Sequence, residues 1–205
     1  MSNPLAIAAV TCTLRNLLAR VATPWAGETD TDLSDTQVTT LPPDKAGLTE
    51  DHNQINLFLF QLHPNAESRN RDNQGKVGGL PALALDLFYM LTAYGRNSDE
   101  ILSQRLLGRA MSLFHSYPVL SATDIAAALP GTDLQNQTDR LRINPHSIPD
   151  EEITRIWTNF QVKYRLSVVY RVSVVLIDHE RSQPAAPAVQ TIQVGVTAPT
   201  RDGAS

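Results

Sequence analysis

The sequence predicts a single α+β domain, with a mainly antiparallel β-sheet flanked by helices and followed by a C-terminal arm. The strongest observation is the segment 164–178, in which apolar residues alternate along its length. Such alternation is typical of a strand with one face in a core. Two shorter apolar segments, 54–63 and 83–93, are suitable partners for it. Helical and strand-like segments follow one another without strict alternation, which favours α+β over α/β.

The chain is predicted to begin with a helix that ends near Val21. Asn3 followed by Pro4 is a favourable start, because Asn caps free backbone amides and Pro fits the first turn of a helix. Apolar residues then recur with a helical period, and Pro24 lies just beyond the expected end.

Residues 22–53 are rich in Thr, Asp, Pro and Gly and predict a long excursion with one short strand at 37–41. A loop of this size is rare in a compact domain and is often a contact element. The segment 54–63 that follows is apolar on both faces, which is typical of an inner strand. Its expected faces are Ile55, Leu57, Leu59 and Gln61 on one side, and Asn56, Phe58, Phe60 and Leu62 on the other.

The segment 83–93 is open to two interpretations. Its Leu, Ala and Met residues favour a helix. We prefer a strand, because Gly78, Gly79 and Pro81 precede the segment and Gly95 ends it.

Five elements are predicted in the second half of the chain. A helix capped by Asn97 or Ser98, with Asp99 and Glu100 at its positive end, is expected to end at Pro118. The others are a short helix at 123–129, a short strand at 139–143, a helix at 149–160 and the long strand. The apolar residues expected to be buried in the helix at 149–160 are Ile153, Ile156, Trp157 and Phe160.

The long strand is predicted to place Leu166, Val168, Tyr170, Val172, Val174 and Leu176 on one face. The other face then carries Arg165, Ser167, Val169, Arg171, Ser173, Val175 and Ile177. We expect Trp157 and Phe160 to pack their helix against the inward face, with Leu166, Val168 and Tyr170 as candidates.

The domain is expected to comprise residues 1–181, and residues 182–205 the arm. Within the arm, 182–188 is a Pro/Ala linker, which cannot extend the preceding strand's ladder. Residues 190–196 alternate like a short strand, and the final residues are expected to be disordered.

Composition excludes several classes of function. The net charge is −4 and no polybasic face is present, so nucleic acid is not an expected partner. The single Cys12 excludes an intrachain disulfide and a thiolate metal cage. No apolar run is long enough for a membrane helix, and no leader segment is recognisable at the N-terminus. The default expectation is a bacterial-type cytoplasmic protein.

No catalytic motif is present in the sequence. The glycine-rich stretch 75–79 lacks the spacing of a phosphate-binding loop, and the five histidines lack the spacing of a zinc site. No serine lies in a Gly-x-Ser-x-Gly turn. Asp86, inside an apolar strand, is the most unusual charge. We interpret it as half of a structural ion pair rather than a catalytic acid, with Arg165, Arg171 or Arg142 as its partner.

A dense polar cluster follows the second predicted strand. One interpretation is a solvated loop. The other is a contact loop, since Arg is enriched at protein interfaces. The cluster consists of Asn65, Arg69, Asn70, Arg71 and Asp72.

Five segments carry a resemblance to a known family. They are AIAAVTCTLRNLL at 6–18, INLFLFQLHPNAESRNRD at 55–72, LPALALDLFYMLTAYG at 80–95, ILSQRLLGRAMSLFHSYPVL at 101–120, and LRINPHSIPDEEITRIWTNFQVKYRLSVVYRVSVVLID at 141–178. In their order and spacing, the chain resembles the tail terminator, or cap, proteins of extracellular contractile injection systems of the antifeeding-prophage and virulence-cassette type. Residues 22–53 and the chain after Arg181 do not contribute to the resemblance.

The resemblance implies a non-enzymatic assembly protein without catalytic residues, metal or cofactor. Such caps are α+β subunits that form a ring, expected to be a hexamer. The ring closes the baseplate-distal end of the inner tube and meets the last sheath layer, which ends polymerisation. The alternative is another structural tube- or sheath-adaptor protein of the same particle, and a more remote one is a small-molecule-binding or enzymatic domain. The partners implied for the cap are copies of the chain itself, the inner tube protein and the sheath protein, with no nucleic acid and no membrane. Assembly is expected in the bacterial cytoplasm, in a particle that is either released or retained.

The segment 190–196 needs a partner, because a lone strand is unstable in water. Two partners are possible: the sheet of its own domain, and the sheet of a neighbouring sheath subunit. The second is considered because the resemblance implies strand exchange between sheath subunits. Candidate assembly contacts are therefore Ile192 and Val194 in the arm, together with Asn65, Arg69, Arg71 and Asp72.

Overall fold

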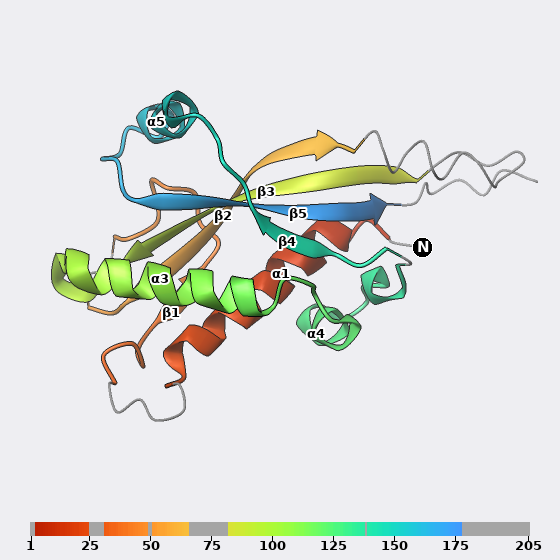
Figure 1. Cartoon of the computed structure of the whole chain (residues 1–205), viewed down its shortest axis with the longest axis horizontal. Helices are drawn as coiled ribbons and strands as arrows, with labels where there is room; N and C mark the ends of the chain where they lie inside the picture. Colours follow the sequence, from red (N-terminus) through yellow and green to blue (C-terminus); the bar gives the residue numbers. More distant parts are fainter. Residues whose placement is uncertain (1–2, 25–30, 49–50, 66–81, 138, 178–205) are drawn as a thin grey trace, which may run out of the picture.

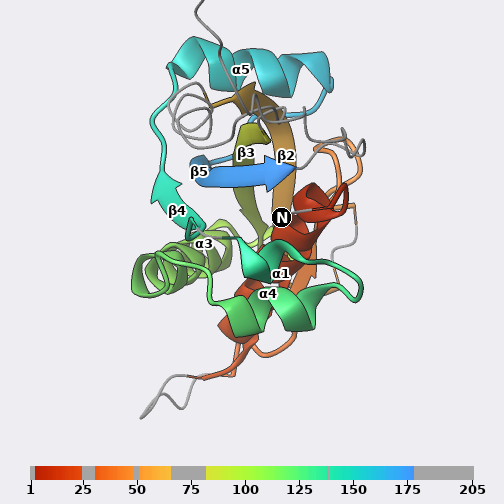
Figure 2. The same ribbon diagram turned by 90° about the vertical axis from the view of Figure 1, so that its right-hand side faces the viewer.

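The computed structural model describes residues 3–24, 31–48, 51–65, 82–137 and 139–177. In this part of the chain, one β-sheet has helices on both faces (Figure 1). On one side lie α1 (Ala6–Leu18), α3 (Glu100–Ser116) and α4 (Ala122–Ala128), and on the other side lies α5 (Asp150–Asn159). The two layers of helices are clearest in Figure 2, with α5 above and α3 and α4 below the sheet. The predicted α+β class is confirmed.

The sheet has five strands in the order β1-β2-β3-β5-β4. β1 pairs with β2 in parallel, and every other neighbouring pair is antiparallel. The strands are β1 (Gln37–Thr39), β2 (Gln54–Pro64), β3 (Leu83–Tyr94), β4 (Arg142–Pro145) and β5 (Ser167–Ile177). Short 3-10 turns occur at Ala19–Ala22, Arg96–Ser98 and Leu134–Asn136.

β3 is the central strand, and every residue of it except Leu83 is buried. Leu87 and Leu91 point into one layer, and Phe88 and Met90 into the other. The Leu, Ala and Met content of this segment favours a helix locally, but a strand buries both of its faces between β2 and β5. The predicted strand is therefore confirmed, and the competing helix is not formed.

A β-bulge in each neighbour of β3 reverses the predicted side-chain alternation. In β2, the pairs Leu59 with Tyr89 and Gln61 with Phe88 leave Phe60 as the extra residue. In β5, Ser173 and Val174 lie opposite the single residue Asp86. One extra residue moves all later side chains to the opposite face.

The faces predicted for the ends of β2 and β5 are therefore wrong. Leu62, rather than Gln61, continues the face that Leu59 begins, since Leu62 pairs with Leu87 of the core. In β5, Val175 and Ile177 join the core in place of Val174 and Leu176.

The main core lies between the sheet and the helices α1 and α3. Phe114 of α3 meets Tyr170 of β5 edge to face, with ring centroids 4.9 Å apart. The hydroxyl of Tyr89 lies 2.9 Å from that of Thr11 on α1, which satisfies both polar groups inside the core. Burial raises the pKa of Tyr89 well above its ordinary value, so this hydroxyl stays neutral.

The helix starts differ from those predicted. Asp99, rather than Asn97 or Ser98, caps α3, because its carboxylate accepts the backbone N–H of Leu102 at 3.0 Å. Asn97 and Ser98 have positive φ and form the turn before the helix. Asn3 accepts the N–H of Leu5, one turn ahead of the first residue of α1.

The short elements are displaced slightly from their predicted bounds. Ser121 caps α4, which therefore begins before residue 123. β4 lies at Arg142–Pro145 rather than at 139–143, because it pairs with β5 only over these residues.

α5 packs on the face of the sheet opposite to the predicted one. Trp157 is buried as predicted, whereas Ile153, Ile156 and Phe160 are half-buried. Phe160 contacts Phe58 of β2 edge to face at 5.5 Å.

The predicted contact of α5 with Leu166, Val168 and Tyr170 is wrong. Val168 and Tyr170 face the main core, which α3 already covers, and Leu166 is 56% exposed.

Replacing Trp157 by Ala is expected to lower the free energy of unfolding by about 3–5 kcal/mol, because a large buried side chain is lost. The matched control is Thr158→Ala, an exposed position on the same helix, for which we expect a change below about 0.5 kcal/mol. Urea unfolding of the isolated chain measures both values. A loss below about 1 kcal/mol for Trp157→Ala would show that α5 is not packed on the sheet.

Candidate assembly surfaces

Asn65 lies at the end of β2, at the tip of the sheet where the predicted polar cluster begins. Its backbone N–H donates to the carbonyl of Ala84 at 2.8 Å. Its side-chain amide donates to both carboxylate oxygens of Asp86, at 3.2 and 3.1 Å. The structure thus places Asn65 in the sheet's own hydrogen bonding. The other candidate contacts, Arg69, Arg71, Asp72, Ile192 and Val194, lie outside the described residues.

The predicted ion pair of Asp86 with an arginine is wrong. Asp86 is 8% exposed, and among the described residues its carboxylate is satisfied by Asn65 rather than by a cation. Arg165 instead pairs with Glu100 at 3.1 Å and lies over the ring of Tyr94 at 4.9 Å. Burial raises the pKa of Tyr94, and this nearby charge opposes the shift.

Three buried amide side chains fix the long excursion before β2. Asn53 donates to the carbonyl of Asp32 and to the carboxylate of Asp35, both at 2.6 Å. Gln54 accepts the N–H of Gly47 at 2.9 Å. Asn56 exchanges two hydrogen bonds with the backbone of Leu41, at 2.9 and 2.8 Å. These amides replace ladder hydrogen bonds that an irregular segment cannot make with itself.

Sequence reasoning missed these amides. The available signal was the cluster Asn53, Gln54 and Asn56 at the start of an otherwise apolar strand. Buried polar side chains need partners, so such a cluster predicts that a neighbouring segment is held there.

Ion pairs add to the attachment of the excursion. Arg96 bridges Asp32 at 3.0 Å and Asp35 at 3.5 Å, and Arg105 of α3 reaches Asp32 at 3.4 Å. All these groups are more than a third exposed, so each pair contributes only about 0–1 kcal/mol. The described part of the excursion, residues 31–48, is thus a positioned surface of the domain on the side of β1.

The β4 edge of the sheet is protected. Leu120 donates to the carbonyl of Leu141 at 3.0 Å, and Ile143 donates to the carbonyl of Pro118 at 2.8 Å. Pro145 at the end of the strand has no N–H to donate. These features occupy the backbone groups with which another strand would pair.

The β2 edge is different. β1 pairs only with Gln54–Asn56, and the rest of β2 has no second neighbour in the part of the chain that the structure describes. Beside this edge, a groove of about 380 Å³ separates β2 from α5. It is lined by Phe60, Gln61, Pro149, Glu151, Glu152, Arg155, Ile156 and Asn159.

A second, mainly apolar groove of about 400 Å³ lies between α3 and β4. It is lined chiefly by Met111, Phe114, Pro118, Ile143 and Tyr170. Met111 is 38% exposed, so the apolar character extends to the surface of α3. Burial raises the pKa of Tyr170, which keeps its hydroxyl neutral.

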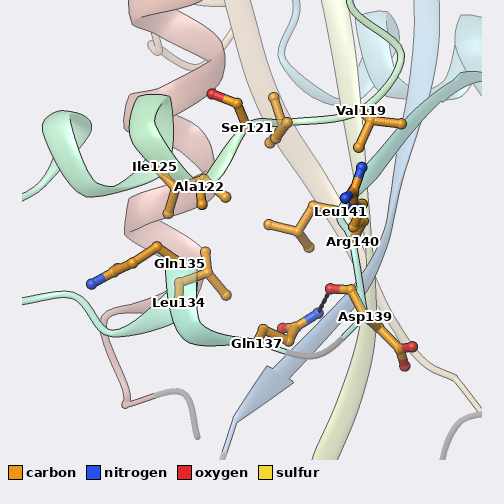
Figure 3. A pocket seen from close by; sticks show the side chains of 11 residues that line it. Val119, Ser121, Ala122, Ile125, Leu134, Gln135, Gln137, Asp139, Arg140 and Leu141 are labelled. Carbon is orange, nitrogen blue, oxygen red and sulfur yellow. Dashed lines mark hydrogen bonds between the residues drawn. The ribbon is translucent and has the colours of Figure 1, made fainter.

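A third pocket, of about 460 Å³, lies between α4 and the segment that leads into β4 (Figure 3). Ile125, Leu134 and Leu141 give it apolar walls. Gln137 is already engaged, since its amide donates to the carbonyls of Asp139 and Val174 and accepts the N–H of Leu176.

The side chains around this third pocket do not form a catalytic arrangement. The hydroxyl oxygen of Ser121 accepts the backbone N–H of Asp124, which caps α4, and the same hydroxyl donates to the Asp124 carboxylate at 2.7 Å. The lining residues include no histidine and no cysteine that could act as base or nucleophile.

Neither a metal site nor a membrane-spanning helix is found among the described residues. His, Cys, Asp and Glu side chains do not gather there in groups of three that a metal ion could bind. No helix in that part of the chain is both long enough and apolar enough to span a membrane.

His63 and His146 lie on either side of Phe88, with ring centroids 5.1 and 5.0 Å from it.

The fold is shared with two solved structures. One is the sheath/tube terminator of the PVC extracellular contractile injection system in its extended state, with a TM-score of 0.62 and 16% sequence identity over 95% of this chain and 64% of that chain. The other is the tube-terminating cap of the anti-feeding prophage, with a TM-score of 0.58 and 15% identity over 91% of this chain and 60% of that chain. The chain therefore spans less than two thirds of the length of these relatives.

Comparison with curated proteins gave no match. The sequence model of the Pvc16 N-terminal domain family matches residues 9–191. This match covers most of the chain, confirms the resemblance found in the sequence, and shows that the chain belongs to the Pvc16 N-terminal domain family.

Proposed function

We propose that this chain is a structural cap, or tail terminator, of a contractile injection particle. It forms a ring on the baseplate-distal end of the inner tube, contacts the last sheath layer, and so ends polymerisation. The observation that carries this proposal is the family match over residues 9–191, together with the fold shared with two terminators. Those terminators are longer chains, and this chain matches only 64% and 60% of their lengths. The proposed function therefore concerns the domain that they share with this chain.

The ring is proposed to contain six copies. A closed ring needs two different surfaces on each copy that fit each other, because its contacts are head-to-tail. The sheet offers two unlike ends, the β1 side with its excursion and the β4 side with its apolar groove against α3. Unlike ends support a head-to-tail contact rather than a two-fold one.

The proposed role is non-enzymatic and uses no metal or cofactor. At the third pocket, Ser121 is engaged in the cap of α4 and Gln137 in hydrogen bonds to β5. The partners are further copies of the chain, the inner tube protein and the sheath protein. A net charge of −4 does not favour nucleic acid, and we propose no membrane partner. Assembly is proposed to occur in the bacterial cytoplasm.

Deleting the gene for this chain is expected to give tubes or sheaths of uncontrolled length, or unstable particles. The reason is that polymerisation loses its end point. Electron microscopy of the deletion strain measures particle length and sheathing, and the same strain supplied with the full chain is the control. Particles of normal, uniform length in the deletion strain would refute the terminator function. Particles without a baseplate would instead indicate an adaptor at the other end.

We also propose that Arg69, Arg71 and Asp72 belong to a contact loop. Arginines are enriched at protein interfaces, where reversing a charge opposes binding. The double variant Arg69→Glu, Arg71→Glu is expected to fold normally but to enter particles roughly tenfold less or worse. The matched control, Lys163→Glu, reverses an exposed charge between α5 and β5. Quantitative immunoblotting of purified particles measures incorporation. Equal incorporation of both variants would show that the segment is a solvated loop and not a contact loop.

A further inference from the structure

The second half of β2 presents unpaired backbone groups at the edge of the sheet. Asn65 donates to Ala84 on β3, so in the antiparallel ladder Leu62 points its N–H and C=O outward. The carbonyl of Asn53 accepts from Gln37 on β1, so by the same alternation Leu59 also points outward. In the described part of the chain, β1 reaches only as far as Asn56.

This edge is apolar as well as unpaired. Leu59 and Phe60 are half-buried, and Leu62 is 44% exposed. Exposed apolar edges pair with other strands unless they are blocked by charges, prolines or covering segments. The β4 edge has such protection. Between Phe58 and His63 the β2 edge has one bulge and no Asp, Glu, Lys or Arg, and Pro64 removes an outward N–H only at the last residue of the strand. Among the described residues, the sheet is thus closed at β4 and open along the second half of β2.

We propose that residues 190–196 of the same chain add to the β2 edge as an antiparallel strand. This inference is independent of the proposed function, and it selects one of the two partners that the sequence leaves open for this segment. The segment, Gln-Thr-Ile-Gln-Val-Gly-Val, has the same length as the edge from Phe58 to Pro64.

The path of the chain favours this pairing. β2 and β5 are both antiparallel to β3, so they run in the same direction and end at the same tip of the sheet. A chain that leaves β5 at Ile177 and turns back therefore runs antiparallel to β2. The distance from β5 to a strand beyond β2 is three strand spacings, about 14 Å. Residues 178–189 reach about 40 Å when fully extended, so the linker is long enough.

The two faces of the segment match the two sides of the edge. On the α1 side, Leu59 and Leu62 continue the apolar core face, which suits Ile192, Val194 and Val196. On the α5 side, the groove beside Gln61 is mixed, with polar groups of α5 such as Glu152 and Arg155 next to the apolar Phe60 and Ile156. The side chains that would face this groove are Thr191, Gln193 and Gly195.

Cysteine cross-linking in the full chain tests the proposal. In a Cys12→Ala background, Leu62→Cys is combined in turn with Ile192→Cys, Val194→Cys or Gln193→Cys. We expect an intrachain disulfide with position 192 or 194 and none with position 193, because Gln193 lies on the opposite face of the proposed strand. Non-reducing electrophoresis and mass spectrometry of the purified monomer identify the bond. Interchain dimers, which would place a second copy on the edge, or equal cross-linking at 193 and 194, would overturn the proposal.

Hydrogen exchange gives a readout that needs no disulfide. Val194→Pro removes a strand N–H and blocks pairing, whereas Ala185→Pro adds a proline to the existing Pro/Ala linker. Amides in the peptide that contains Leu59 and Leu62 are expected to exchange roughly tenfold faster or more in Val194→Pro, and at the unmodified rate in Ala185→Pro. Equal exchange of this peptide in the unmodified chain, in Val194→Pro and in Ala185→Pro would show that residues 190–196 do not cover this edge.

Discussion

The structure depends on the burial of β3 on both faces. Leu87 and Leu91 occupy the layer of α1 and α3, whereas Phe88 and Met90 occupy the layer of α5. A strand with this pattern is stable only when helices cover both sides and strands pair on both edges. The antiparallel partners β2 and β5 supply the edges, and each contains a bulge that turns its end relative to β3. The remaining elements are arranged around this three-stranded centre.

The two ends of the sheet have different chemistry, and this difference supports the proposed head-to-tail contact in a ring. At the β4 end, Pro118 and Leu120 occupy the backbone groups of the edge. At the β1 end, Asn53 and Asn56 hold a long excursion by hydrogen bonds rather than by a regular strand. A ring subunit needs two unlike surfaces that can meet, and the excursion at one end of the sheet differs in this way from the closed β4 edge at the other.

The order and type of the main elements could be predicted from the sequence. The face of the sheet on which each side chain or helix lies could not. The strands at 54–63, 83–93 and 164–178 could be predicted because apolar runs and alternation are local signals. The bulges at Phe60 and Ser173 could not, since they depend on pairing with β3, and each reverses the later side chains. The side of the sheet that α5 covers likewise depends on tertiary packing, such as the contact of Phe160 with Phe58, and not on a local sequence signal. Of the candidate contacts, the structure describes only Asn65, which binds Asp86 where an arginine was expected.

We propose that this fold ends the inner tube of a contractile particle. Cryo-electron microscopy of intact particles tests it most directly, by locating the chain in an averaged reconstruction. We expect a six-fold ring of this domain at the baseplate-distal end, in contact with the last layers of tube and sheath. Density for the chain at the baseplate, along the sheath, or in a single copy per particle would contradict it.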